Sequence, residues 1–132
     1  MVKFPPKVTA YLKGKHIGKL ATLMKDGSPH VAPIWYMLDH GKLIVNTTTQ
    51  RVKYFNMKRD DRVCFLVDSG YPHVIFFGRA RIADERDAKK DIETLAIRYT
   101  GTAEGKKAAR ERFWKEPRVS IEIIPERVVV GL

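Results

Sequence analysis

One short polar segment contains the residue types that bind a phosphate group. Residues 46–53 read Asn-Thr-Thr-Thr-Gln-Arg-Val-Lys, and they follow an apolar run and lead into an expected helix over 50–58. The free N–H groups at the start of a helix attract anions, and Arg51 and Lys53 would add two cations at the same place. The threonine hydroxyls add further hydrogen-bond donors. We therefore predict that this segment holds a phosphate-bearing ligand.

The same residues also fit an ordinary helix start, because threonine often precedes a helix and basic residues often face solvent. The preceding strand favours the ligand interpretation, since it delivers Asn46, Thr47 and Thr48 to the place where the two cations lie. Each charge-assisted hydrogen bond to a phosphate contributes roughly 1.5–3 kcal/mol. Arg51 and Lys53 with a few N–H donors could thus anchor a nucleotide-like cofactor at about micromolar strength or better.

No other part of the sequence carries a recognised catalytic spacing. The four histidines show no HExxH spacing and have no carboxylate cluster beside them, so we expect no metal site. A Gly-x-Ser-x-Gly elbow, a P-loop and a Rossmann glycine pattern are all missing. An enzyme without its own reactive side chains commonly takes its chemistry from a cofactor. This agrees with the predicted phosphate site.

The composition predicts one globular domain with a basic surface. The length of 132 residues predicts a single domain over 1–132. The lone cysteine, Cys64, excludes an internal disulfide and fits the reducing cytoplasm, and no apolar stretch is long enough to span a membrane. The net charge of +10 could attract nucleic acid or an anionic small molecule. Nucleic acid is the less favoured partner, because zinc-finger, basic-zipper and RNA-recognition patterns are lacking.

Alternating apolar residues and turn signals predict a mostly β chain with helical inserts. Strands are expected over 17–24, 30–38, 43–46, 62–67, 73–82, 119–124 and 127–130. Helices are expected over 6–12, 50–58, from an N-cap at Asp84 to a C-terminal cap at Gly101, and over 103–114. Gly78 predicts a bulge or close backbone approach within its strand, and Pro125 separates the last two strands. Six or seven short strands with tight turns predict a closed or split β-barrel.

The expected strand over 30–38 is apolar on both faces. Val31, Pro33, Trp35 and Met37 alternate with Ala32, Ile34, Tyr36 and Leu38. The outer face of a barrel strand in a monomer is expected to be polar, so a helix, a ligand or a partner must cover this one. A homodimer is the simplest arrangement that does so.

Several short motifs occur in a fixed order along the chain. They lie at residues 27–35, 46–56, 59–63, 77–80, 98–101 and 125–128. Together they resemble the pyridoxamine-phosphate-oxidase-like family of flavin-binding split barrels, especially its flavin/deazaflavin oxidoreductase branch. The resemblance covers nearly the whole chain. It implies a homodimer of six-stranded antiparallel split barrels, with two cofactors in clefts between the subunits.

The resemblance also implies which residues contact the cofactor. Its phosphate would be held by Arg51 and Lys53. Its ribityl chain or ring would be hydrogen-bonded by three polar residues of one strand, Asn46, Thr47 and Thr48. The ring pocket would be lined by Pro33, Ile34 and Trp35 and covered from the second subunit by Tyr71 and His73.

Two cofactors fit these contacts, because FMN and the deazaflavin coenzyme F420 share a ribityl-phosphate group. F420 adds an acidic glutamyl tail, which a basic surface favours. The resemblance implies an F420- or FMN-dependent oxidoreductase that transfers a hydride between the cofactor and a small conjugated organic substrate. Two alternatives stay open: a cofactor carrier or storage protein without turnover, and a basic β-barrel that binds nucleic acid.

Overall fold

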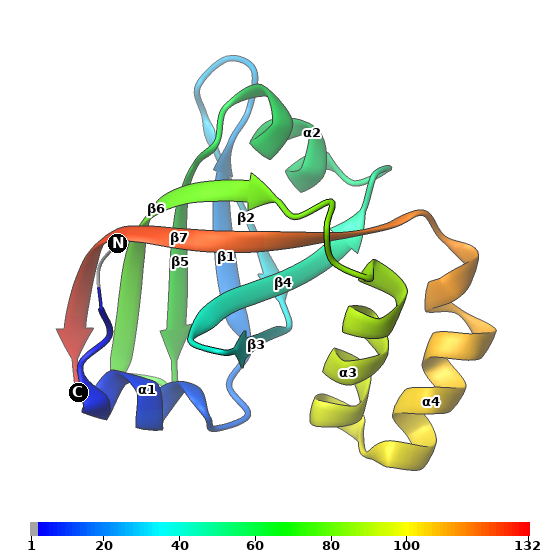
Figure 1. The fold of residues 1–132 in the computed structure, drawn as a ribbon. Coiled ribbons are helices and arrows are strands. Elements are labelled where there is room, and N and C mark those ends of the chain that lie inside the picture. The colour runs from blue at the N-terminus through cyan, green and yellow to red at the C-terminus, as the bar shows by residue number, and fades with distance from the viewer. Residues whose placement is uncertain (1–2) are drawn as a thin grey trace.

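The computed structural model describes residues 3–132, whose strands form one curled antiparallel sheet (Figure 1). The strands are β1 (Gly18–Leu23), β2 (Pro29–Ile34), β3 (Tyr36–Asp39), β4 (Lys42–Thr48), β5 (Arg62–Asp68), β6 (His73–Ile82) and β7 (Arg118–Gly131). Their order across the sheet is β2-β1-β5-β6-β7-β4-β3. The predicted mostly β fold with helical inserts is confirmed.

The helices lie at the two ends of the sheet and along one side (Figure 1). They are α1 (Pro6–Leu12), α2 (Val52–Arg59), α3 (Ala88–Thr100), α4 (Thr102–Glu111) and the short 3₁₀ helix η1 (Phe113–Lys115). The N-cap of α3 is Asp87 rather than the expected Asp84, because the Asp87 side chain accepts a hydrogen bond from the Lys90 N–H. Gly101 ends α3 with a φ of 97°, as predicted. No helix within residues 3–132 is long and apolar enough to cross a lipid bilayer.

The sheet has seven strands rather than the six that the resemblance implies. The strand expected over 30–38 is broken at Trp35 into two strands. The first part, β2, pairs with β1, whereas the second part, β3, pairs with β4. These partners lie near opposite edges of the sheet. Trp35 alone therefore connects the two edges, and this connection curls the sheet into a half-barrel.

The two strands expected on either side of Pro125 form one continuous strand, β7. It pairs with β6 along one side and with β4 along the other. Pro125 does not end it, because the register shifts between Phe77 and Gly78, opposite the proline, and a bulge tolerates a residue without an N–H. A Cβ on Gly78 would overlap the carbonyl oxygen of Ile124. The predicted bulge and close approach at Gly78 are confirmed.

Two apolar clusters lie on opposite faces of the β3–β4 pair. The barrel core includes Tyr36, Val45, Phe65 and Phe76, all fully buried. On the outer face, α3 packs Ile92 and Leu95 against Met37 and Ile44. The helix thus buries the outer face at β3, where Met37 is 7% exposed, while Val31 on β2 is 62% exposed. The outer apolar face is therefore covered by α3 at its β3 end and remains exposed at its β2 end.

Candidate functional site

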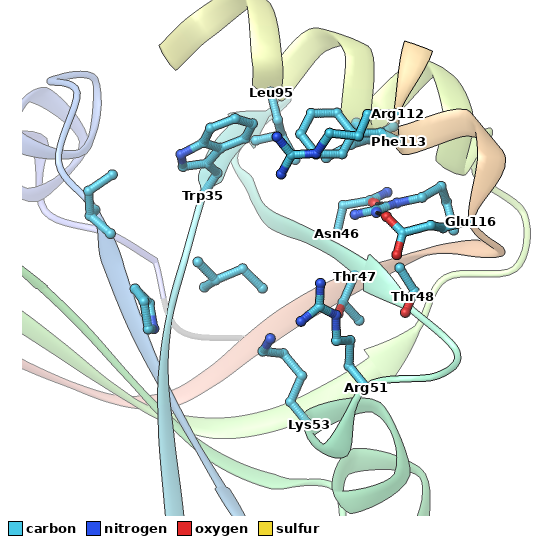
Figure 2. Close-up of a pocket in the computed structure, with 15 residues that line it drawn as sticks. Trp35, Asn46, Thr47, Thr48, Arg51, Lys53, Leu95, Arg112, Phe113 and Glu116 are labelled. Carbon is cyan, nitrogen blue, oxygen red and sulfur yellow. Dashed lines mark hydrogen bonds and ion pairs between the residues drawn. The ribbon is translucent and has the colours of Figure 1, made fainter. Parts of the chain in front are cut away.

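A pocket of about 460 Å³ opens between β4, the start of α2 and the segment that follows α4 (Figure 2). This volume is within the range of small-molecule and cofactor sites. Its lining residues are Ile17, Pro33, Ile34, Trp35, Asn46, Thr47, Thr48, Arg51, Lys53, Ile92, Leu95, Arg112, Phe113, Glu116 and Arg118.

The pocket brings together all the predicted site residues except Tyr71 and His73. Tyr71 lies in the β5–β6 turn and is 92% exposed. The ring of His73 packs against Gly131, and its Nδ1 lies 2.7 Å from the Tyr71 carbonyl oxygen. Their role as contacts from a second subunit stays a prediction.

The end of β4 delivers three polar side chains to the pocket. Asn46, Thr47 and Thr48 are at most 5% exposed, because β4 lies between β3 and β7 in the sheet. The Thr48 hydroxyl accepts a hydrogen bond from the Gln50 N–H at 3.2 Å, and the Thr48 carbonyl accepts one from the Arg51 N–H at 3.3 Å. This tight turn brings Arg51 back beside the strand.

Arg51 and Lys53 point into the pocket from the same side (Figure 2). Arg51 is the N-cap residue of α2, and within the described chain no side chain accepts a hydrogen bond from the first N–H groups of this helix. Such groups are free to bind an anion. Burial and the nearby charges of Arg51 and Arg118 lower the pKa of Lys53 from its ordinary value. A negative charge in the pocket would offset this repulsion.

Arg118 is a pocket residue that the sequence did not indicate. It begins β7 directly opposite Thr48, and its side chain is only 8% exposed. Its Nη1 lies 3.4 Å from the Glu116 carboxylate, and its Nε donates to Asn46 Oδ1 at 3.0 Å. Burial, together with the Arg51 charge, lowers the pKa of Arg118. Only the pairing of two strands distant in sequence places this cation beside Arg51.

The opposite wall of the pocket is aromatic and apolar (Figure 2). The ring of Phe113 meets Trp35 edge-on, with centroids 5.9 Å apart, and Arg112 lies over Phe113 at 5.0 Å. Leu95 of α3 adds a buried apolar side chain. The sequence did not indicate Arg112, Phe113 or Leu95, because the α3–α4 hairpin reaches the pocket only through tertiary packing.

The electrostatics of the pocket favour an anionic ligand. Its lining contains four cations, Arg51, Lys53, Arg112 and Arg118, against one carboxylate, Glu116. Lys53 and Arg118 are partly buried, and charges removed from water are destabilising without a partner. The pocket has Arg51 and Lys53 at one side, threonine hydroxyls between, and the flat aromatic wall at the other side. This arrangement suits a ligand that joins a phosphate to a planar ring through a hydroxylated chain. The residues present therefore fit a ribityl-phosphate cofactor.

Comparison with known proteins identifies related chains. The sequence profile of a family described as pyridoxamine 5'-phosphate oxidase matches residues 4–130. A conserved hypothetical protein from Mycobacterium tuberculosis has a similar structure, with a TM-score of 0.76 and 29% identity over 97% of this chain and 84% of that one. An F420 reductase is similar with a TM-score of 0.74 and 25% identity, over 96% of this chain and 98% of that one. The split-barrel fold and the resemblance carried by the motifs are confirmed.

A curated relative has a known activity. It is a 5a,11a-dehydrotetracycline/5a,11a-dehydrooxytetracycline reductase from Streptomyces rimosus, 32% identical over 69 residues. The matched part is 49% of this chain and 49% of the relative, so the chain spans about half the length of the relative that it matches.

Proposed function

Because this chain belongs to the pyridoxamine 5'-phosphate oxidase family, we propose that its pocket binds F420 or FMN and that the protein is an oxidoreductase. One observation carries the proposal: Arg51 and Lys53 lie across the pocket from the aromatic wall of Trp35 and Phe113 (Figure 2). The bound ring would supply hydride transfer to or from a small conjugated substrate. The protein would supply binding, orientation and exclusion of water.

Each wall of the pocket has a distinct part in this proposal. Arg51 and Lys53 bind the phosphate, and Thr48 keeps its hydroxyl hydrogen available for the ribityl chain, because its oxygen accepts from the Gln50 N–H. Trp35 is held parallel to Tyr99 at 5.2 Å, so it offers a rigid surface to the ring. Leu95 helps to keep water from that surface.

The charge of the pocket favours F420 over FMN as the cofactor. A single phosphate carries about −1.5 to −2 at neutral pH, which leaves part of the positive charge of the lining unmatched. F420 carries additional carboxylates on its glutamyl tail. The likeness to an F420 reductase and to a tetracycline-type reductase supports an F420-dependent reductase as the first activity to test.

A second candidate function, a cofactor carrier without turnover, is favoured by the scarcity of proton-transfer groups. Among the lining residues, Glu116 is the one carboxylate, and neither histidine nor cysteine is present. The Glu116 carboxylate is already 3.4 Å from Arg118. Within one subunit, a substrate that needs a proton would therefore take it from water or from the ligand itself.

We also propose that the protein is a homodimer formed through the open face of the sheet. Val31, Ala21, Cys64 and Phe77 are successive cross-strand neighbours on β2, β1, β5 and β6. Val31 and Phe77 are 62% and 36% exposed, although they are large apolar side chains. An apolar face of this extent favours association with a second copy. That copy would also bring Tyr71 and His73 to the pocket.

Val31→Glu tests the dimer, because it places a charge on this face without disturbing the core. We expect wild-type protein to sediment as a dimer in analytical ultracentrifugation and the variant to shift toward monomer. The matched control is Lys25→Glu in the exposed β1–β2 turn. If wild-type protein sediments as a monomer at micromolar concentration, the dimer proposal is contradicted.

The cofactor proposal is tested by fluorescence titration of stripped protein with F420 and with FMN. We expect saturable binding of at least one, and we expect Arg51→Ala to weaken it by roughly 1.5–3 kcal/mol, or about tenfold to a hundredfold in Kd. Arg110→Ala is the matched control, since Arg110 is an exposed α4 residue outside the pocket lining. Binding of neither cofactor, or equal binding by the Arg51 variant and wild type, would contradict the proposal. A salt-sensitive gel shift in that case would favour nucleic-acid binding.

A further inference from the structure

A chain of hydrogen-bonded side chains leads from the pocket to the first turn of α3. Arg118 Nε donates to Asn46 Oδ1 at 3.0 Å, and Asn46 Nδ2 donates to Ser120 Oγ at 3.2 Å. The Ser120 hydroxyl in turn donates to Asp91 Oδ2 at 2.6 Å. Asn46, Ser120 and Asp91 are 5%, 1% and 7% exposed. The chain is therefore shielded from water except at its Arg118 end, in the pocket.

The Asp91 carboxylate at one end of this chain and the Arg118 guanidinium at the other set the direction of its hydrogen bonds. Arg86 donates to both carboxylate oxygens of Asp91, at 2.7 and 3.1 Å, and a carboxylate beside a guanidinium acts as an acceptor. The Ser120 hydroxyl must then donate to Asp91, which leaves its oxygen to accept from the Asn46 amide. This fixes the amide with its oxygen toward Arg118.

Asn46 has no N–H group left for a ligand. Its Nδ2 also donates to the Ala88 carbonyl oxygen at 3.0 Å, so both amide hydrogens are used. The amide oxygen accepts from Arg118. Asn46 thus serves to hold Arg118, and a ligand contact through its side chain would be limited to the oxygen.

Arg118 is an almost buried cation with unused donors. Its side chain is 8% exposed, and its Nε is occupied by the hydrogen bond to Asn46 Oδ1. Its Nη1 has a 3.4 Å contact with Glu116, and among residues 3–132 no protein atom accepts a hydrogen bond from Nη2. A guanidinium that is largely removed from water gains from a charged acceptor at its remaining N–H groups. A phosphate held by Arg51 and Lys53 in the same pocket would provide such acceptors.

We propose that Arg118 is a third phosphate-binding residue of this pocket and that Ser120, acting through Asn46, is a positioning residue that orients it. The proposal rests on the proposed function, because it assigns a further residue to the same ligand. Ser120 does not line the pocket, so it can affect the ligand only through this chain. Removing its hydroxyl leaves the Asn46 amide nitrogen held by the Ala88 carbonyl alone, and this weaker hold loosens the guanidinium.

If the proposal holds, substitutions of Arg118 and Ser120 should weaken only ligands that carry a phosphate. A variant that folds poorly would instead lose affinity for ligands with and without the phosphate. We compare the Kd of FMN with that of riboflavin, which lacks the phosphate; if only F420 binds, the pair is deazariboflavin 5'-phosphate and deazariboflavin. Arg118→Gln should weaken the phosphorylated ligand by about tenfold or more, with less than about a twofold change for the phosphate-free one. Ser120→Ala should weaken it by about threefold to tenfold, again only for the phosphorylated ligand. Arg110→Gln and Ser28→Ala, both at exposed positions, are the matched controls.

A double-mutant cycle tests the coupling between Ser120 and Arg118. In the Arg118→Gln background, Ser120→Ala should cause no further loss of FMN affinity, because the residue that it positions is gone. Arg118→Lys keeps the buried charge without the Nε donor, so it should bind FMN with intermediate affinity. Thermal unfolding of each variant checks that it folds. Equal losses for FMN and riboflavin, an undiminished Ser120 effect without Arg118, or wild-type affinity in Arg118→Lys would each overturn the proposal.

Inorganic phosphate provides a probe that needs no cofactor. Phosphate should raise the thermal unfolding temperature of wild-type protein and raise it less in Arg118→Gln. Equal protection of both would overturn the role of Arg118. If FMN binding depends on Arg51 but not on Arg118, the proposed function stands and this inference fails. If wild-type protein binds neither cofactor nor phosphate, both fail.

Discussion

The indole ring of Trp35 lies parallel to the ring of Tyr99, with centroids 5.2 Å apart and an interplanar angle of 6°. The Tyr99 hydroxyl donates to the His16 carbonyl oxygen at 2.7 Å, just before β1. The same hydroxyl accepts from the Tyr36 N–H at 3.3 Å, just after the strand break. Tyr99 of α3 therefore holds Trp35 in place. Trp35 in turn forms part of the aromatic wall of the pocket and connects the two edges of the sheet.

Tyr99→Phe should destabilise the protein while preserving the stacked ring. The His16 carbonyl loses its 2.7 Å donor, so we expect the free energy of unfolding to fall by roughly 1–3 kcal/mol. Tyr99→Leu removes the stacking on Trp35 as well and should cost about 0.5–1.5 kcal/mol more. Urea denaturation measures both. Equal stability of Tyr99→Phe and wild type would show that this hydroxyl contributes nothing.

Tyr36 should make stability depend on alkaline pH. The pKa of Tyr36 is raised from an unperturbed value of 10.0 to about 12, and burial is the largest cause. The protonated hydroxyl donates to the Leu12 carbonyl oxygen at 2.9 Å, which a phenolate could not do. Since the folded pKa is the higher one, this contribution is complete below pH 10 and is lost as pH rises toward 12.

The comparison with Tyr36→Phe isolates this dependence, because both proteins share every other titrating group. The difference between their unfolding free energies should be constant below pH 9 and should change by roughly 2–3 kcal/mol between pH 10 and 12. Denaturant titrations across that range measure it. A difference that stays constant up to pH 12 would contradict the assignment.

Because of Lys53, phosphate binding should weaken at a pH below the one at which lysine ordinarily loses its proton. Its pKa is lowered by burial and by the charges of Arg51 and Arg118, so it loses its proton below the ordinary value of 10.5. We expect the FMN affinity of wild-type protein to decline as pH rises toward 10. Lys53→Arg, which stays charged, should remove this decline. Lys25→Arg in an exposed turn is the control, and an unchanged pH dependence in Lys53→Arg would exclude Lys53 as its source.

Gly78→Ala should be among the most damaging small substitutions. The added Cβ would overlap the Ile124 carbonyl oxygen and crowd Pro125 Cα, both backbone atoms that cannot move freely. We expect a loss of about 3 kcal/mol or more. Gly70→Ala is the matched comparison: φ is +87° there and nothing lies within 4 Å, so it should cost about 1–2 kcal/mol from backbone strain alone. Thermal or urea unfolding that ranks them in the opposite order would contradict the clash.

The sequence predicted those features of the fold that depend on residues close together in the chain. The bounds of β6, the bulge at Gly78 and the end of α3 at Gly101 follow from alternation and from glycine conformations within a few residues. The break at Trp35 carries no alternation signal, because residues 31–38 are apolar or aromatic on both sides of it. The continuity of β7 through Pro125 depends on Gly78, a residue distant in the sequence that provides the opposing bulge.

The same distinction holds for the pocket. The residues from Asn46 to Lys53 are contiguous, so their position in one pocket could be predicted, and their role in binding a phosphate stays a prediction. Arg118 enters the pocket because the register of β4 and β7 places it opposite Thr48. Phe113 enters because α3 and α4 pack beside the sheet (Figure 1). Cross-strand register and helix docking are tertiary properties that a single sequence does not display.

The position of β7 between β6 and β4 also governs how a growing chain can fold. β7 follows all the other elements in the sequence, yet it is the strand that links the β2-β1-β5-β6 meander to the β4–β3 hairpin. Before it emerges from the ribosome, both inner edges lack their partner and can pair with neighbouring chains. Such late, long-range pairing is slow. Nascent chains halted before Arg118 should therefore recruit chaperones, whereas those carrying all of β7 should not.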